Sequence, residues 1–213
     1  FTESFPYKPS SPYSASKASA EHAIHSYVNS FFSQKKNKIR IASARAGNVI
    51  GGGDWSEDRI VPDCVRSWTK SKKVIIKNPN STRPWQHVLE PLGGYICLAQ
   101  ALNNNKKLHG ESFNFGPPLS QNKTVLDIVR EFSNFFVNSK WAILKKKNKK
   151  IIESNLLKLN CEKSFQLLNW NSSINFSDLV QLTSEWYQSY IDNSDLEKVT
   201  NEQIEIYYNK ALT

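Results

Sequence analysis

The sequence predicts an α/β fold: a partial doubly wound parallel sheet with a smaller, mostly helical C-terminal lobe. Three observations lead to this prediction. Short runs rich in β-branched and small residues, such as 39–46 and 112–115, alternate with stretches of helical periodicity. The last third of the chain shows mainly helical patterns. Apolar residues make up 39% and charged residues 22% of the 213 residues, a balance that favours a folded core over disorder.

The chain opens with a turn-rich segment, a helix and a strand. Three prolines in the first twelve residues predict an extended start. A helix is expected over 11–32, because apolar residues recur there at spacings of three and four. These residues are Ala20, Ala23, Ile24, Tyr27 and Phe31. The segment 39–46 then predicts a strand, and the glycines of 51–54 predict a loop.

Four elements are expected in the middle of the chain. Apolar residues four apart predict a short helix over 60–68, and 74–76 predicts a short strand. A longer helix is expected over 90–102, where Leu92, Ile96 and Ala99 share one face. The segment 112–115 predicts another strand, which a Gly-Pro-Pro sequence ends.

The C-terminal part is expected to be mostly helical. Thr124 and Asp127 form a capping-box pattern, which predicts a helix from there to about 137. A weak strand is expected near Ile151. Three helices are expected after it, over 161–168, 177–191 and 200–212.

The net charge of +9 is concentrated in one lysine-rich run. Its six cations are Lys140, Lys145, Lys146, Lys147, Lys149 and Lys150. Such a run is more often a solvated turn than a nucleic-acid footprint, so no nucleic-acid partner is expected. A non-catalytic basic binding module remains the alternative of a different class. No membrane contact is expected, because no stretch approaches the roughly 18 apolar residues of a membrane span.

The three cysteines indicate neither a metal site nor a disulfide framework. Cys64, Cys97 and Cys161 are odd in number and far apart, and no C-x-x-C pair occurs. Cys64 and Cys97 lie within apolar helical patterns, so we expect them to be buried free thiols. This cysteine usage fits a reducing, cytoplasmic compartment.

Tyr13 and Lys17 form the first candidate site. Their spacing of four on a helix places a phenol and an ammonium group on one face, one turn apart. A nearby cation favours a phenolate over a phenol, and a phenolate can act as a general base. The same spacing arises often by chance, so an ordinary surface pair is the alternative.

The second candidate site follows the strand at 39–46. Consecutive glycines in 51–53 permit a close approach of the backbone to a ligand. Ligands of α/β sheets lie beyond the carboxyl ends of strands, where Asn48 can form a hydrogen bond to one. Arg83 and Arg59 are candidates for phosphate contacts. The alternatives are a tight turn capped by Asn48 and ordinary surface arginines.

Together, these strings resemble the nucleotide-sugar 4,6-dehydratases of the extended short-chain dehydrogenase/reductase superfamily. Residues 11–21 are similar to the catalytic helix of that superfamily, and residues 2–12 to the approach to it. The strings that resemble the CDP-glucose 4,6-dehydratase branch in particular are 45–55, 58–63, 83–91, 156–163 and 185–187. The resemblance therefore covers nearly the whole chain.

The resemblance implies a Rossmann-like sheet and an enzyme that uses NAD as a recycled hydride carrier. In this family the tyrosine, here Tyr13, takes the proton of the sugar 4-hydroxyl as hydride passes from C4 to NAD. The lysine, here Lys17, holds the nicotinamide ribose. Water then leaves across C5 and C6 of the 4-keto sugar, and hydride returns to C6. The net reaction is a hydro-lyase reaction that gives a 4-keto-6-deoxy sugar nucleotide.

The resemblance also assigns binding residues. Arg45 and Val49 are expected beside NAD. The residues expected to bind the nucleotide-diphosphate sugar are Asn48, Arg59, Arg83 and Asn114. His87 is expected to be structural, and no metal is implied.

The resemblance divides the chain into two parts. Residues 1–50 correspond to the C-terminal part of an NAD-binding Rossmann-like domain, including the Tyr13 helix. Residues 51–213 correspond mainly to a substrate-binding lobe, with about 84–115 returning to the Rossmann-like sheet. The implied assembly is a homodimer that forms through the Tyr13 helix and its neighbour.

Two features of the family have no counterpart in the chain. These are the G-x-x-G-x-x-G turn that seats the cofactor pyrophosphate and the acid/base residues of the elimination, which lie upstream of the tyrosine in the family. The chain is therefore expected to be a C-terminal fragment that alone neither binds NAD tightly nor turns over. The alternatives within the superfamily are a dTDP-glucose 4,6-dehydratase and a sugar-nucleotide epimerase or reductase, such as one similar to UDP-glucose 4-epimerase.

Overall fold

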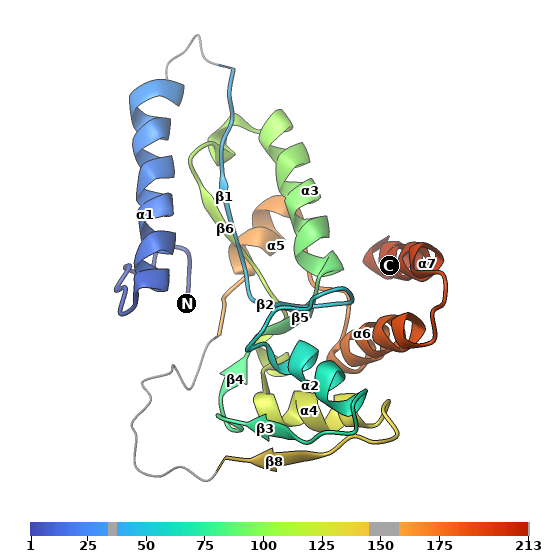
Figure 1. Cartoon of the computed structure of the whole chain (residues 1–213). Coiled ribbons are helices and arrows are strands. Elements are labelled where there is room, and N and C mark those ends of the chain that lie inside the picture. The colour runs from blue at the N-terminus through green and yellow to red at the C-terminus, as the bar shows by residue number, and fades with distance from the viewer. Residues whose placement is uncertain (34–37, 145–157, 213) are drawn as a thin grey trace.

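The computed structural model of the chain describes residues 1–33, 38–144 and 158–212 (Figure 1). Its helices and strands are, in chain order, α1 (Pro12–Tyr27), a π-helical turn (Val28–Phe32), β1 (Ser43–Ala46), β2 (Asn48–Ile50), α2 (Ile60–Trp68), β3 (Val74–Ile76), β4 (Thr82–Arg83), β5 (Trp85–His87), α3 (Leu89–Asn104), β6 (Ser112–Phe115), β7 (Lys123–Thr124), α4 (Val125–Ser133), β8 (Trp141–Ile143), α5 (Glu162–Leu168), α6 (Phe176–Ile191) and α7 (Leu196–Leu212). Short 3₁₀ turns follow α3 and β6.

Within the described residues, the strands form two-stranded pairs, most of them parallel. β1 pairs with β6, β2 with β5 and β3 with β8 in parallel, whereas β4 and β7 are antiparallel. Parallel strands need crossover connections, which helices supply here as in other α/β proteins. The predicted α/β class is therefore confirmed. In Figure 1, α1 and α3 lie on opposite sides of the β1–β6 pair.

Two apolar clusters form the core. The larger one joins α2, β3, α4 and α6, and its most deeply buried members include Phe132, Leu179 and Tyr187. The smaller cluster joins α3, α5 and β6 around Phe113 and Phe115, both with no exposed surface. The C-terminal helices thus contribute to both clusters, because α6 packs in the first and α5 in the second.

Helix α1 begins where the sequence predicts but exposes its apolar face. Ser11 and Ser14 form reciprocal capping hydrogen bonds, and Pro12 occupies the first turn, where its missing N–H is tolerated. The five apolar residues of the predicted stripe are not buried: Ala20, Ala23, Tyr27 and Phe31 are exposed and Ile24 is half-buried. A cavity, described below, separates Ala20 and Ile24 from the sheet, whereas the other three residues lie outside its lining.

Helix α3 shows the same departure. The predicted face of Leu92, Ile96 and Ala99 is exposed, and the buried residues are Glu90, Pro91, Gly94 and Leu98. Gly94 explains which side is buried. Its hydrogen-only side chain lets the Phe115 ring approach the helix backbone closely, where a Cβ atom would overlap the ring.

The remaining predictions hold for the longer elements and for the strand at 74–76, which is β3, but five other short strands were not predicted. β2, β4, β5, β7 and β8 have only two or three residues each, which is too short for an alternating pattern to be recognised. Helix α4 ends at Ser133 rather than near 137, and α7 begins at Leu196 rather than 200. The strand expected near Ile151 and the lysines at 145–150 lie outside the described residues.

The cysteines are free, and one expectation about them is wrong. Cys64 is buried in α2, where burial raises the pKa of its thiol well above the ordinary value. Cys97 is half-buried rather than buried, because it lies at the edge of the smaller cluster. None of the described helices combines the length and the apolar character that a membrane crossing needs.

We predict that Gly94→Ala destabilises the chain. Alanine gains about 1 kcal/mol of helix propensity over glycine, but overpacking against the Phe115 ring costs about 1–3 kcal/mol. The net effect, measured as the free energy of unfolding in urea, is expected to be a loss. Ala99→Gly on the exposed side of α3 measures the propensity contribution alone. In a Phe115→Leu background the cost of Gly94→Ala should shrink, and an unchanged cost would show that the ring is not its cause.

Candidate active site

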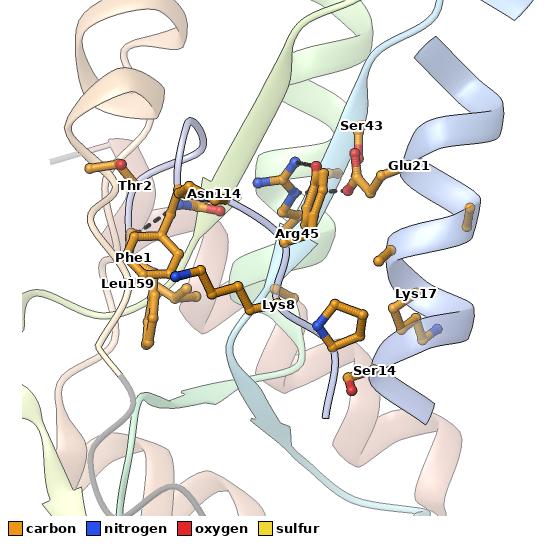
Figure 2. Close-up of a pocket in the computed structure, with 18 of the residues that line it drawn as sticks. Phe1, Thr2, Lys8, Ser14, Lys17, Glu21, Ser43, Arg45, Asn114 and Leu159 are labelled. Carbon is orange, nitrogen blue, oxygen red and sulfur yellow. Dashed lines mark hydrogen bonds and ion pairs between the residues drawn. The ribbon is translucent and has the colours of Figure 1, made fainter. Parts of the chain in front are cut away.

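A cavity of about 760 Å³ lies between α1 and the β1–β6 pair (Figure 2). Its walls come from the N-terminal segment 1–9, from one face of α1 and from β1, with Asn114 and Leu159 on the far side. The volume falls in the range of small-molecule and cofactor pockets, which is about 300–1,000 Å³. The cavity is therefore the candidate active site of the chain.

Tyr13 and Lys17 both line this cavity from the first turns of α1. The Lys17 Nζ atom lies 5.6 Å from the centroid of the Tyr13 ring, so the phenol and the ammonium group share one helix face. The Tyr13 side chain is 74% exposed, which leaves its hydroxyl accessible to a ligand. The capped start of α1 fixes the backbone of both residues.

One turn further along α1, Glu21 connects the helix to both strands. Its Oε1 atom accepts hydrogen bonds from Arg45 Nε at 2.8 Å and from Ser43 Oγ at 2.6 Å. Its Oε2 atom accepts one from Ser112 Oγ on β6 at 3.3 Å. Figure 2 shows Glu21 meeting Ser43 and Arg45 across the gap between α1 and β1. Glu21 is thus the polar anchor of the helix that carries Tyr13.

The surroundings of Glu21 favour its charged form. Burial alone would raise the pKa of this carboxyl, but the hydrogen bonds from Arg45 and Ser43 and the charge of Arg45 hold the pKa below its usual value. The Arg45 pKa is raised, chiefly by its hydrogen bond to Glu21. Burial raises the pKa of Tyr7, whose hydroxyl accepts a hydrogen bond from Arg45. Glu21 and Arg45 are therefore a stable ion pair at neutral pH.

Asn114 reaches the cavity from β6, but its polar groups have protein partners. Its side-chain Nδ2 donates to the carbonyl oxygens of Phe1 at 3.3 Å and Asn160 at 3.1 Å. Its backbone N–H donates to Glu3 Oε1 at 2.9 Å, and its carbonyl accepts from Ser164 Oγ at 2.6 Å. In this arrangement Asn114 holds the N-terminal segment and the start of α5 against β6.

The other sequence-predicted residues lie outside the lining of the cavity. Asn48 and Val49 belong to β2, where they pair with Trp85 and Gln86 of β5. Gly47 allows this turn from β1 to β2, because a Cβ atom there would lie 2.7 Å from the Pro84 carbonyl oxygen. The structure therefore brings Tyr13, Lys17, Arg45 and Asn114 together and places Asn48 two residues beyond Ala46, which lines the cavity.

Arg83 and Arg59 also lie apart from the cavity. Arg83 is half-buried on β4, directly opposite Lys123 of β7, and its Nη1 atom donates to the Thr82 carbonyl at 2.8 Å. Arg59 is exposed at the residue that precedes α2. The two arginines come from segments that flank β3, on the side of the molecule that holds the larger core cluster.

His87 and Glu90 are buried near the start of α3. Burial lowers the pKa of His87 to about 4, so its imidazole is neutral at physiological pH. Burial also raises the pKa of Glu90, which accepts hydrogen bonds from the backbone N–H groups of Ser173 at 2.8 Å and Ile174. Glu90 therefore supports the join between α3 and the segment before α6, and His87 accepts a hydrogen bond from the Leu89 N–H at 3.4 Å.

The sequence analysis missed Glu21 and Tyr7, which both line the cavity. Glu21 follows Tyr13 by eight residues, so its place on the same helix face was available from the spacing. Its partners Ser43 and Arg45 could not be inferred, because they depend on how α1 meets β1. No cluster of three or more His, Cys, Asp or Glu side chains among the described residues could hold a metal ion.

Comparison with protein families decides where the chain belongs. Residues 1–183 match the family model described as GDP-mannose 4,6 dehydratase. The chain is a member of this family. The predicted membership among nucleotide-sugar 4,6-dehydratases is thereby confirmed.

Two dehydratases of known name are similar to the chain in sequence. It is 39% identical over 199 residues to the CDP-glucose 4,6-dehydratase of Salmonella typhimurium, covering 92% of this chain and 55% of that protein. It is 25% identical to the dTDP-glucose 4,6-dehydratase of Haemophilus influenzae, covering 88% of this chain and 54% of that protein. The chain thus spans about half the length of these family relatives.

Solved structures show the same fold. The dTDP-glucose 4,6-dehydratase of Bacillus anthracis, in complex with NAD, matches with a TM-score of 0.72 at 22% identity over 90% of this chain and 57% of that chain. The UDP-glucuronic acid 4-epimerase of Bacillus cereus, in complex with UDP-glucuronic acid and NAD, matches with a TM-score of 0.69 at 22% identity over 86% of this chain and 54% of that chain. The chain therefore has the Rossmann-like α/β fold that this dehydratase and this epimerase share.

We predict that Glu21→Gln removes part of the acid sensitivity of the chain. The unfolded pKa of a glutamate is about 4.3, and the folded pKa of Glu21 is lowered. Its stabilising contribution is therefore complete above about pH 4.3 and is lost as the pH falls through the lower, folded value. At neutral pH the variant should lose about 1–3 kcal/mol, because Arg45 keeps a weaker acceptor.

The measurement is urea unfolding at a series of pH values between about 3 and 7. Lys210 forms a 2.5 Å ion pair with Asp178, and Asp178→Asn serves as the control because it removes a carboxylate far from the cavity. A parallel pH dependence in the Glu21→Gln variant and the unmodified chain would show that Glu21 is not the group responsible.

Proposed function

We propose that the chain supplies the catalytic Tyr13–Lys17 helix and the substrate-binding residues of an NAD-dependent CDP-glucose 4,6-dehydratase. The product is then CDP-4-keto-6-deoxyglucose. The observation that carries the proposal is that Tyr13 and Lys17 share one face of α1 and line a cavity of about 760 Å³. The choice of CDP-glucose is supported by the 39% identity to the Salmonella typhimurium enzyme.

In this proposal Tyr13 is the general base. Its exposed hydroxyl accepts the proton of the sugar 4-hydroxyl, for which it must first lose its own proton. The ammonium group of Lys17 lies beside the Tyr13 ring and has donors for ribose hydroxyls. Arg45, held by Glu21 and Tyr7, keeps the floor of the cavity in place beside the cofactor.

The residues around the cavity fit one end of NAD. When bound, NAD accepts hydride from the sugar and returns it later in the reaction. The hydroxyl of Tyr13 and the ammonium group of Lys17 can form hydrogen bonds to ribose hydroxyls. The volume of the cavity is large enough for the nicotinamide and its ribose. The chain has no G-x-x-G-x-x-G sequence for the cofactor pyrophosphate, so residues beyond this chain are needed to hold that part.

The substrate is proposed to be held by its diphosphate and sugar. Arg83 and Arg59 contact the diphosphate, since a guanidinium matches phosphate oxygens with two parallel hydrogen bonds. Asn48 contacts the sugar beyond the carboxyl end of β1, and Val49 offers backbone near the nicotinamide. Asn114 borders the nucleotide site, although its amide group is engaged with the N-terminal segment.

A sugar-nucleotide 4-epimerase is the second candidate. It is favoured by the similarity of the fold to the Bacillus cereus 4-epimerase, at a TM-score of 0.69. The two reactions differ in product mass, because the dehydratase product has lost one water and an epimerase product has not.

We further propose that the enzyme is a cytoplasmic homodimer. The exposed aromatic side chains of Tyr27 at the end of α1 and Phe31 in the π-helical turn support the dimer, and the free cysteines support the compartment.

We predict that Tyr13→Phe strongly slows the dehydratase reaction. The assay uses the chain joined to the upstream residues that the family resemblance predicts, and it measures by mass spectrometry the loss of water from CDP-glucose. The variant should be about 10²–10⁴-fold slower, because it lacks the group that accepts the proton. Tyr27→Phe, also exposed on α1, should keep the unmodified rate. A Tyr13→Phe rate within a few-fold of the unmodified rate would exclude Tyr13 as the base.

We predict that the 213-residue chain by itself binds NAD more weakly than micromolar. The reason is that the pyrophosphate of NAD finds no glycine-rich turn in this sequence. Isothermal titration calorimetry of NAD into the chain measures the affinity directly. The chain extended by its predicted upstream residues is the positive control. Micromolar binding to the chain alone would refute the fragment interpretation.

A further inference from the structure

The walls of the cavity carry more positive than negative charge. Its charged lining residues are Lys8, Lys17, Glu21 and Arg45. The Glu21 carboxylate pairs with Arg45 at 2.8 Å, so these two charges balance each other. Among the described residues, neither lysine forms an ion pair with a carboxylate. Two cations of the lining are therefore available to an anionic ligand.

Lys8 is held in place by the residues on either side of it. Pro9 follows directly, and a proline fixes its own φ angle and restricts the backbone of the residue before it. On the other side, the Tyr7 hydroxyl accepts a hydrogen bond from Arg45, and the centroids of the Tyr7 and His22 rings are 5.3 Å apart. The segment that carries Lys8 is thus attached to both β1 and α1, which fixes the place of Lys8 on the cavity wall.

The Lys8 side chain extends across the cavity, away from α1. Figure 2 shows it directed toward Phe1, Leu159 and Asn114, whereas Lys17 lies on α1 at the opposite side. Lys8 is exposed, and in the described parts of the chain its ammonium group has no hydrogen-bond partner. Its three N–H donors are therefore free for a ligand in the cavity.

The orientation of the sugar decides which group of the ligand meets Lys8. In the proposed function Tyr13 takes the proton of the sugar 4-hydroxyl, so C4 of the sugar faces α1. C1 is the opposite corner of a pyranose ring, and it carries the diphosphate. The phosphate next to the sugar therefore leaves C1 on the side of the cavity away from α1, which is the side toward which Lys8 extends.

We propose that Lys8 binds the phosphate next to the sugar, which is the β-phosphate of CDP-glucose. This inference rests on the proposed function, in which Tyr13 fixes the orientation of the sugar. The ammonium group is a compact charge with three donors, and its hydrogen bonds to phosphate oxygens are of the strong, charge-assisted kind. Arg83 and Arg59 lie outside the cavity lining, so Lys8 is the contact on the cavity side of the diphosphate.

The experiment titrates CDP, CMP and NAD into the chain joined to its predicted upstream residues, by isothermal titration calorimetry. Lys8→Gln should weaken the binding of CDP by about ten-fold, since a charged hydrogen bond is lost. The affinities for CMP, which lacks the β-phosphate, and for NAD should stay unchanged. Lys8→Arg should retain most of the affinity for CDP. Lys72→Gln, at an exposed lysine outside the cavity lining, should bind CDP as the unmodified enzyme does.

Kinetics and thermal unfolding separate a binding role from a structural one. A phosphate contact is made equally in the ground state and the transition state, so Lys8→Gln should raise the KM for CDP-glucose about ten-fold and leave kcat unchanged. Without ligand, Lys8→Gln should unfold at the same temperature as the unmodified enzyme, because the Lys8 side chain is exposed. A lower unfolding temperature, without rescue of CDP binding by Lys8→Arg, would overturn the proposal in favour of a structural lysine.

The remaining outcomes distinguish this inference from the proposed function. Equal affinities of Lys8→Gln and the unmodified enzyme for CDP would overturn the role of Lys8 and leave the proposed function standing. A loss for CMP as large as that for CDP would exclude the β-phosphate, and a loss for NAD alone would assign Lys8 to a cofactor phosphate instead. No binding of CDP by the unmodified enzyme would also overturn the inference, and the product assay with Tyr13→Phe then decides the proposed function by itself.

Discussion

The position of the candidate base depends on one ion pair, between Glu21 of α1 and Arg45 of β1. Helices α2, α4 and α6 are held by the burial of several apolar side chains each, but α1 buries only Ala18. The Glu21 carboxylate compensates by accepting hydrogen bonds from Arg45, Ser43 and Ser112, which reach it from both β1 and β6. Because Tyr13 and Glu21 are on the same rigid helix, this anchor sets the distance between the phenol and the end of β1.

Because α1 is anchored by polar contacts and not by apolar burial, the site that it carries is open to solvent. A general base works best where water is limited, yet the Tyr13 side chain is 74% exposed and much of the apolar face of α1 is open. Leu92 and Ile96 on α3 are also exposed, on the other side of the β1–β6 pair. The chain spans about half the length of its family relatives, and both exposed faces flank the β1–β6 pair.

The elements that could be predicted from the sequence are the longer ones whose signals lie within a few neighbouring residues. Helices α1, α2, α3 and α6 and the strand β6 are encoded by periodicity and capping within a few neighbouring residues, and the sequence is sufficient to find them. The faces they bury are not encoded in the same way. Gly94 rather than Leu92 faces the core, since the close approach of the Phe115 ring to the helix backbone decides the side. The family strings located Tyr13 and Lys17, but neither they nor the periodicity contained the antiparallel register that places Lys123 opposite Arg83.

Two arginines that the sequence singles out have different places in the fold. Arg45 has a carboxylate partner at 2.8 Å, so its charge is balanced within the protein and its contribution is to hold β1 and α1 together. Arg83 lies on β4, opposite Lys123 of β7, and is not part of the cavity lining. Because the Arg45 guanidinium is engaged by Glu21 and Tyr7, it has little left to offer a phosphate group. The proposed function therefore assigns the diphosphate to Arg83 and Arg59, and assigns to Arg45 the task of keeping the helix of Tyr13 in place.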